Sequence, residues 1–120
     1  MFLSLLKSKL HMASVTKTEL TYHGSITIDA ELMAAVGLRP HEKVLVSNCS
    51  TGQRGETYVL KGRKGKRDIQ LNGAMARLAQ PGDRIIVMAF ALLTPEEADR
   101  HTPVVAILDA DNRITETIGG

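Results

Sequence analysis

The sequence predicts an all-β fold, a small β-barrel with short helices. Short apolar runs, several of them alternating with polar residues, recur along the chain with turn residues between them, and the segments with helical signals are brief. A chain of 120 residues is long enough for one domain with a single core. That core must be aliphatic, because aromatic residues make up 3% of the chain and tryptophan is absent.

The first predicted strand covers residues 6–15 and has two chemically different faces. One face carries the potentially cationic residues Lys7, Lys9 and His11. The other face carries Leu6, Ser8, Leu10 and Met12. Lysines on such a face are typical of a solvated edge strand, because they discourage pairing with other chains.

The stretch of residues 21–27 has two possible interpretations. Apolar or aromatic residues alternate with polar ones on both sides of Gly24-Ser25, which is typical of two strands joined by a turn. In the chemical alternative, the Ser25 hydroxyl attacks the Gly24 carbonyl, which no β-carbon shields, and the acyl group moves from nitrogen to oxygen. The rest of the sequence must decide between the two.

Local signals predict the later elements. Asp29 can cap a helix over residues 30–36 that ends at Gly37, and Thr94 with Glu97 forms the capping box of another helix. Asn72-Gly73 leads into a brief helix. Residues 84–93 are apolar almost throughout, which predicts a central strand buried on both faces. The other predicted strands cover residues 43–47, 56–61, 68–71, 103–108 and 113–118.

Composition limits the partners and the compartment. The net charge of +2 is too small to indicate nucleic-acid binding by itself, although residues 62–67 form a basic, glycine-spaced loop. The single cysteine, Cys49, is expected to be a small buried hydrophobe in a reducing compartment, and it lacks the neighbours of a zinc site. No stretch approaches membrane-spanning length. We therefore expect a soluble cytoplasmic protein that binds neither membrane nor nucleic acid.

Several chemically unusual features occur together in one order along the chain. They are Lys9, His11, Tyr22-His23-Gly24-Ser25, Arg54, Thr57-Tyr58 and Asn72-Gly73-Ala74. In this order and spacing the chain resembles the aspartate 1-decarboxylase family, small pyruvoyl enzymes that make β-alanine for pantothenate and coenzyme A biosynthesis. The resemblance spans essentially the whole length. It favours the chemical interpretation of Gly24-Ser25.

The resemblance implies a fold, an assembly and a cofactor. The fold would be a six-stranded double-psi β-barrel with short helices, assembled as a homotetramer with active sites between subunits. The single domain would be made as an inactive precursor that cuts itself between Gly24 and Ser25, giving chains 1–24 and 25–120. Ser25 would become a pyruvoyl group that binds substrate as a Schiff base, with no pyridoxal phosphate and no metal. Whether a maturation partner assists the cut stays open.

The resemblance also implies roles for individual residues. Arg54 and Lys9 would bind the two carboxylates of aspartate, and Tyr58 would donate a proton after carbon dioxide leaves. Thr57 and Asn72 would hold the Gly24 carbonyl during cleavage and contact substrate. The remaining implied pocket residues are Gly73, Ala74, Met75, His11 and Tyr22. Met75 departs from the run of alanines that is usual in the family, and its longer side chain is expected to narrow the pocket.

Two alternative functions are weighed beside this one. The first is a pyruvoyl decarboxylase of another small amino acid, for which Met75 is the reason. The second is a small basic β-barrel that binds nucleic acid through the loop of residues 62–67. The scarcity of aromatic residues for base stacking argues against the second.

Overall fold

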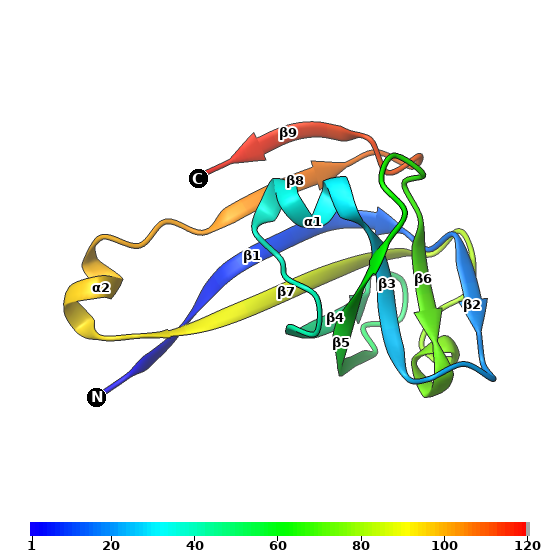
Figure 1. The fold of residues 1–120 in the computed structure, drawn as a ribbon, viewed down its shortest axis with the longest axis horizontal. Coiled ribbons are helices and arrows are strands. Elements are labelled where there is room, and N and C mark those ends of the chain that lie inside the picture. Colours follow the sequence, from blue (N-terminus) through cyan, green and yellow to red (C-terminus); the bar gives the residue numbers. More distant parts are fainter. Residues whose placement is uncertain (120) are drawn as a thin grey trace.

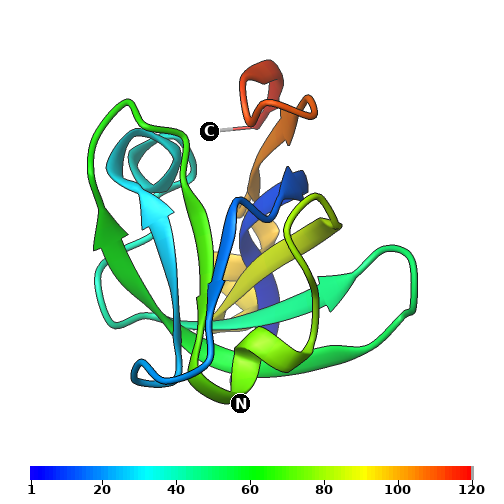
Figure 2. The same ribbon diagram turned by 90° about the vertical axis from the view of Figure 1, so that its right-hand side faces the viewer.

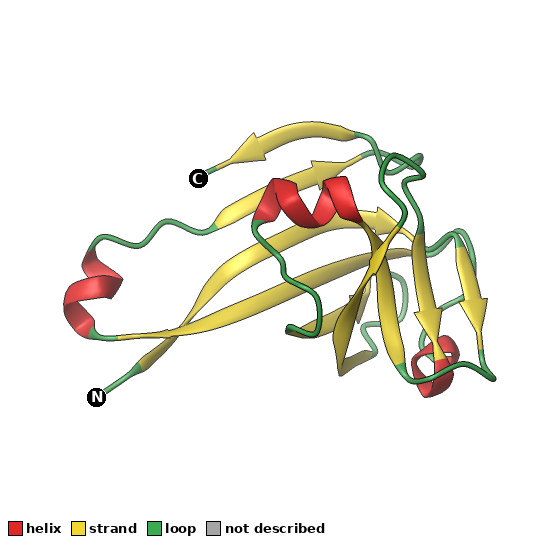
Figure 3. Ribbon diagram, viewed as in Figure 1, coloured by secondary structure: helices red, strands yellow, loops and turns green. Residues whose placement is uncertain are grey.

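Nine strands and three short helices make up the described part of the chain. The computed structural model describes residues 1–119, and Figures 1 and 3 show the ribbon. The strands are β1 (Leu3–Ser14), β2 (Lys17–Glu19), β3 (Ser25–Asp29), β4 (Lys43–Asn48), β5 (Arg54–Gly62), β6 (Ile69–Asn72), β7 (Arg84–Leu93), β8 (Val104–Leu108) and β9 (Ile114–Ile118). The helices are α1 (Ala30–Val36), the 3-10 helix η1 (Gly73–Arg77) and α2 (Pro95–Asp99).

The strands form one hydrogen-bonded series in the order β2-β6-β3-β5-β4-β7-β1-β8-β9. β1 with β8, β2 with β6, and β3 with β5 are parallel pairs, and the other neighbours are antiparallel. Figure 2 shows the strands curling around a common interior. The prediction of an all-β fold with short helices is confirmed. The series has nine strands where the family resemblance implied six, so the double-psi arrangement stays a prediction.

The core is aliphatic, as composition predicted. Its buried members, among the described residues, are all Val, Ile, Leu, Met or Ala. Most lie on the inward positions of β1, β3, β4, β6 and β7, where the period-2 alternation of a strand places every second side chain. Burial of these side chains is the main force that holds the curled sheet together.

The Asp29 carboxylate joins three parts of the chain. It caps α1 by accepting from the Glu31 N–H at 2.8 Å, and it also accepts from the N–H groups of Gly65 and Arg67 in the loop after β5. Gly37 ends α1 in the left-handed conformation with φ 75°. The predicted limits of this helix are confirmed, and so is the capping box of Thr94 and Glu97 at α2.

The expectation that residues 84–93 are buried on both faces is wrong. β7 is central, but its burial alternates: Ile85, Val87 and Ala89 are buried, whereas Phe90 and Leu92 are 48% and 70% exposed. Only one face of β7 meets the interior of this chain. Its other face carries apolar side chains that the described residues leave uncovered.

The expectation that Lys7, Lys9 and His11 share one strand face is wrong for Lys7, whereas Lys9 and His11 do share a face. The pairing of β1 with β7 shifts register between Leu6 and Ser8, and again before Ala13. The extra residue at the first bulge is Lys7, whose ammonium donates to the Gly37 carbonyl at 2.8 Å and pairs with the Glu42 carboxylate at 2.6 Å. A bulge reverses the facing of the residues beyond it, so simple alternation fails here.

The structure also bears on the expected burial of Cys49 and on the search for a membrane-spanning segment. Cys49 is exposed, so the expectation that it is buried is wrong; the preceding residue, Asn48, takes the buried position at the end of β4. The Cys49 Sγ lies 3.5 Å from the Met12 Sδ. Among the described residues, none of the helices is both long and apolar enough to cross a membrane.

We predict that Asp29→Ala lowers the free energy of unfolding by about 3 kcal/mol, because it removes a helix cap and the acceptor of the Gly65 and Arg67 N–H groups. Urea denaturation measures the change. Asp99→Ala, at the exposed end of α2, is the matched control and should change stability by less than about 0.5 kcal/mol. A loss at Asp29 no larger than at Asp99 would contradict the bracing role of its carboxylate.

Candidate active site

Ser25 is the first residue of β3, and its side chain is buried. Gly24 before it is exposed, and the turn lies upstream at Leu20 and Thr21, where the Tyr22 N–H donates to the Glu19 carbonyl at 3.3 Å. The interpretation of Gly24-Ser25 as the turn itself is therefore wrong. The bond between them joins an exposed loop to a buried strand end.

The Ser25 hydroxyl is held from two sides. It donates to the His23 carbonyl at 3.1 Å and accepts from the Asn72 Nδ2 at 2.9 Å. Ser25 and Asn72 are partners in the antiparallel pairing of β3 with β6, and neither is exposed to solvent. Asn72 also donates from Nδ2 to the Thr27 Oγ1 at 3.0 Å. The hydroxyl oxygen thus has a fixed place one residue from the Gly24 carbonyl.

Gly73 brings the start of η1 against the same loop. Its φ is +64°, and a β-carbon there would lie 2.7 Å from both the Gly24 N and Cα and 2.9 Å from the Tyr22 carbonyl oxygen. No residue with a side chain fits this approach. In Figure 1, η1 lies at the end of β6, beside the loop that joins β2 to β3.

Thr57 and Tyr58 reach the same end of the sheet from β5. The parallel pairing of β3 with β5 sets Ile26 opposite Val59, so Thr57 and Tyr58 precede this pair on β5 as Gly24 and Ser25 do on β3. Tyr58 is 36% exposed, and its ring centroid lies 6.4 Å from that of His41. The phenol is therefore open to a ligand.

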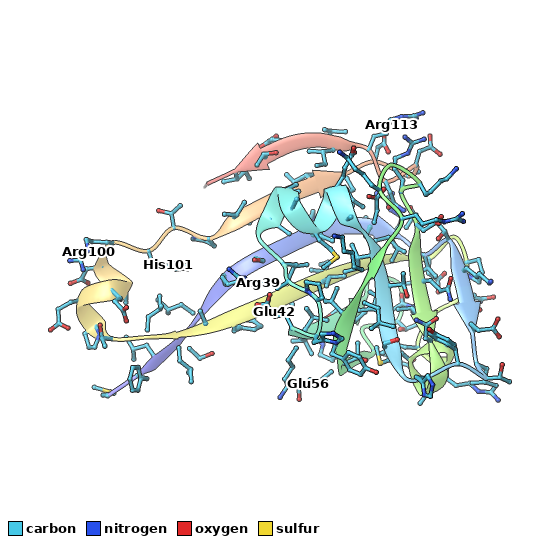
Figure 4. The ribbon with its side chains drawn as sticks, in the orientation of Figure 1. Arg39, Glu42, Glu56, Arg100, His101 and Arg113 are labelled. Carbon is cyan, nitrogen blue, oxygen red and sulfur yellow. The ribbon has the colours of Figure 1, made fainter. Side chains whose placement is uncertain are left out.

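Arg54 lies on the rim of a hollow of about 620 Å³ on the outer face of β4, β5 and β7. Its guanidinium donates to the Gly52 carbonyl at 3.4 Å and forms no ion pair with the described residues. Glu56 points away from the sheet in Figure 4 and pairs with Lys43 at 3.0 Å. Arg54 and Glu56 line the hollow, as do Met88 and Phe90.

Lys9 and His11 lie away from Ser25 within one chain. Both are on β1, where Lys9 pairs with Met88 of β7 and Val105 of β8, and neither strand adjoins β3. The structure therefore brings Ser25, Asn72 and Gly73 together and leaves the cations of β1 apart from them.

Met75 turns toward β5. A β-carbon built on Gly55 would lie 3.4 Å from the Met75 Sδ, and Met75 packs against the core. Ala74 and Tyr22 are exposed, and the Tyr22 ring meets the His23 ring edge-on at 5.5 Å. The contact with Gly55 explains how a long side chain is accommodated after Asn72-Gly73.

Gln70 is a site residue that the sequence analysis missed. Its Nε2 donates to the Asn72 Oδ1 at 2.7 Å. The signal was the spacing of two residues along β6, which places Gln70 and Asn72 on one strand face. Within residues 1–119, no group of three or more His, Cys, Asp or Glu side chains is placed to hold a metal ion.

The His11 imidazole is placed where a positive charge is unfavourable. Burial lowers the pKa of His11 below 6.5, and the charges of Lys9 and Arg84 lower it further. Its Nδ1 is buried without a hydrogen-bond partner among the described residues. The folded protein therefore favours the neutral ring.

Known proteins give an independent comparison. A family profile described as "Aspartate decarboxylase" matches residues 1–115. A protein of Caldicellulosiruptor bescii named "Aspartate 1-decarboxylase" is 55% identical over 95% of this chain and 89% of its own length. Proteins of the same name from Chlorobium chlorochromatii and Pelotomaculum thermopropionicum are 55% and 51% identical over 93% and 100% of this chain, covering 87% and 91% of their own lengths.

The lowered pKa of His11 predicts a pH effect on stability. The unfolded chain takes up a proton near pH 6.5, whereas the folded chain resists it, so stability should fall as the pH drops through 6.5 toward the folded pKa. His11→Asn should flatten this part of the profile, measured by melting temperature between about pH 7.5 and 5. His41→Asn, at an exposed site, is the control. Parallel profiles for wild type and His11→Asn would refute the effect.

Proposed function

The chain belongs to the aspartate decarboxylase family of enzymes, and on this premise we propose that it converts L-aspartate to β-alanine and carbon dioxide. The reaction would use a pyruvoyl group formed from Ser25 after the chain cuts itself at Gly24-Ser25. The β-alanine would serve pantothenate synthesis in the cytoplasm. The observation that carries the proposal is the buried Ser25 hydroxyl, held by Asn72 beside the Gly24 carbonyl.

The proposed cleavage begins with an acyl shift. The Ser25 Oγ forms a bond to the Gly24 carbonyl carbon, the bond from that carbon to the Ser25 nitrogen breaks, and the hydroxyl proton passes to the nitrogen. Loss of the Cα proton of residue 25 then breaks the Cβ–O bond of the ester, which releases Gly24 as a free carboxylate and leaves dehydroalanine. Water converts the dehydroalanine to a ketone at position 25 with release of ammonia. Asn72 suits the first step, because its Nδ2–H stabilises negative charge on the Ser25 oxygen as the proton leaves.

The residues present fit a pyruvoyl group at position 25. Such a group supplies a ketone that takes the substrate amine and accepts the electrons released with carbon dioxide. Asn72 and Thr27 would keep polar groups beside it, and the tight approach of Gly73 would exclude bulk from one side. Tyr58, with its partly exposed phenol, is the proposed proton donor, and Thr57 a substrate contact.

The two carboxylates of aspartate would be bound most strongly by cationic side chains. Arg54 supports this role because it has no ion-pair partner among the described residues. Lys9 lies on β1, away from Ser25 of its own chain. We propose that it serves the site of a neighbouring subunit in a homotetramer of double-psi barrels. The uncovered Phe90 and Leu92 support an assembly of this kind, because exposed apolar faces are costly in water.

An intact mass measurement under denaturing conditions tests the proposed function. Wild type should give two chains, split after Gly24, with a ketone-reactive end on the larger. Ser25→Ala should give one folded, uncut chain without decarboxylase activity, because only the attacking oxygen is lost. Normal turnover of aspartate by Ser25→Ala would end the pyruvoyl proposal. Comparable turnover of glutamate or cysteinesulfinate by wild type would point to another amino acid as substrate.

Gly73→Ala should slow the cleavage by at least about tenfold, because the new methyl group displaces the segment from Tyr22 to Gly24. Gly65→Ala is the matched control: its φ is +82°, yet its β-carbon would meet nothing within 4 Å. Both variants bear the cost of a positive φ, and only the first has the clash. Equal cleavage rates in the two variants, measured by mass at successive times, would show that the close approach has no role.

A further inference from the structure

We propose that Gln70 is a positioning residue that sets the direction of the hydrogen-bond chain ending at Ser25. This inference rests on the proposed self-cleavage at Gly24-Ser25. The chain runs from Gln70 Nε2 to Asn72 Oδ1 at 2.7 Å, and from Asn72 Nδ2 to Ser25 Oγ at 2.9 Å. Gln70 thus acts through Asn72, without touching the reacting atoms.

The groups around Asn72 favour one orientation of its amide, and Gln70 is the donor on the Oδ1 side. Asn72 Nδ2 faces two hydroxyls, those of Ser25 and Thr27. The Ser25 hydroxyl donates to the His23 carbonyl and so accepts from Asn72, whereas the Thr27 hydroxyl would accept either orientation of the amide. A donor at Oδ1 favours the orientation with Nδ2 toward Ser25, and Gln70 supplies that donor.

The orientation matters for the acyl shift. With Nδ2 toward Ser25, the amide N–H stabilises the negative charge on the Ser25 oxygen as its proton leaves and before its bond to the Gly24 carbonyl carbon is complete. In the reversed orientation, the Asn72 carbonyl oxygen would face the developing charge and repel it. Asn72 is fully buried, so water does not screen this difference.

The strand geometry makes the arrangement testable by substitution. Gln70 is partly exposed, opposite Lys17 of β2 and Thr27 of β3 in the two strand pairings. A charged side chain at position 70 can therefore be accommodated. Lys17 is exposed and can turn away from a lysine at position 70 or pair with a glutamate there; such a glutamate still offers no donor to Asn72.

The test compares a donor with an acceptor at one position. Gln70→Lys can only donate to Asn72 Oδ1, whereas Gln70→Glu can only accept, which favours the reversed amide. Each chain is made in a purified translation system, and the fraction cut after Gly24 is followed by intact mass. Gln70→Lys should cut within about threefold of wild type and Gln70→Glu about tenfold slower, a factor that corresponds to roughly 1.4 kcal/mol. Melting temperatures of both variants in a Ser25→Ala background report on folding alone.

Three outcomes decide the inference. The inference is supported if Gln70→Glu is cleaved slowly, Gln70→Lys is cleaved fast and the two variants have similar melting temperatures. A purely structural role of Gln70 would not separate the two cleavage rates. Equal rates in the two variants, whether fast or slow, overturn it while leaving the self-cleavage intact. A wild-type chain that is never cut overturns the proposed function and this inference together.

Discussion

The hydrogen bond from the buried Asn72 amide to the Ser25 hydroxyl is the interaction on which the site depends. It links β6 to the first residue of β3, so the Ser25 oxygen is fixed by sheet pairing as well as by its own loop. A side chain on a strand is held more rigidly than one on a loop. The exposed Gly24 side of the bond, in contrast, is placed by the close approach of Gly73. The Ser25 side of the bond is thus held by the sheet, and the Gly24 side is confined by Gly73.

Cationic and exposed apolar side chains lie close together on one surface of the chain. The anchored Lys7 is neutralised by Glu42, whereas Arg54 has no acidic partner among the described residues. Phe90 and Leu92 lie on the outer face of β7, beside the hollow that Arg54 also lines. An unpaired cation next to an uncovered apolar face is an arrangement that a neighbouring subunit can complete.

Local chemistry made part of this structure predictable. The limits of α1 follow from Asp29 and Gly37, and those of α2 from the capping box of Thr94, because the deciding contacts lie within a few residues. The bulge at Lys7 was not predictable, since its cause is the long-range contact with Gly37 and Glu42. The same applies to the site. Ser25 and Asn72 stand out by motif, and the two-residue spacing of Gln70 and Asn72 is visible in the sequence, but it indicates a shared face only once β6 is known to extend to Asn72.

The position of β1 between β7 and β8 determines how the molecule can refold after cleavage. If the bond after Gly24 is cut, the short fragment keeps a strand inserted between β7 and β8, and extracting it would expose buried Leu10 and Ala13. The fragments therefore stay together, although no peptide bond joins them. Refolding after denaturation, however, becomes an encounter between two molecules, and its rate depends on concentration. A chain that folds first and is cut afterwards reaches a state that the separated fragments recover only slowly when dilute.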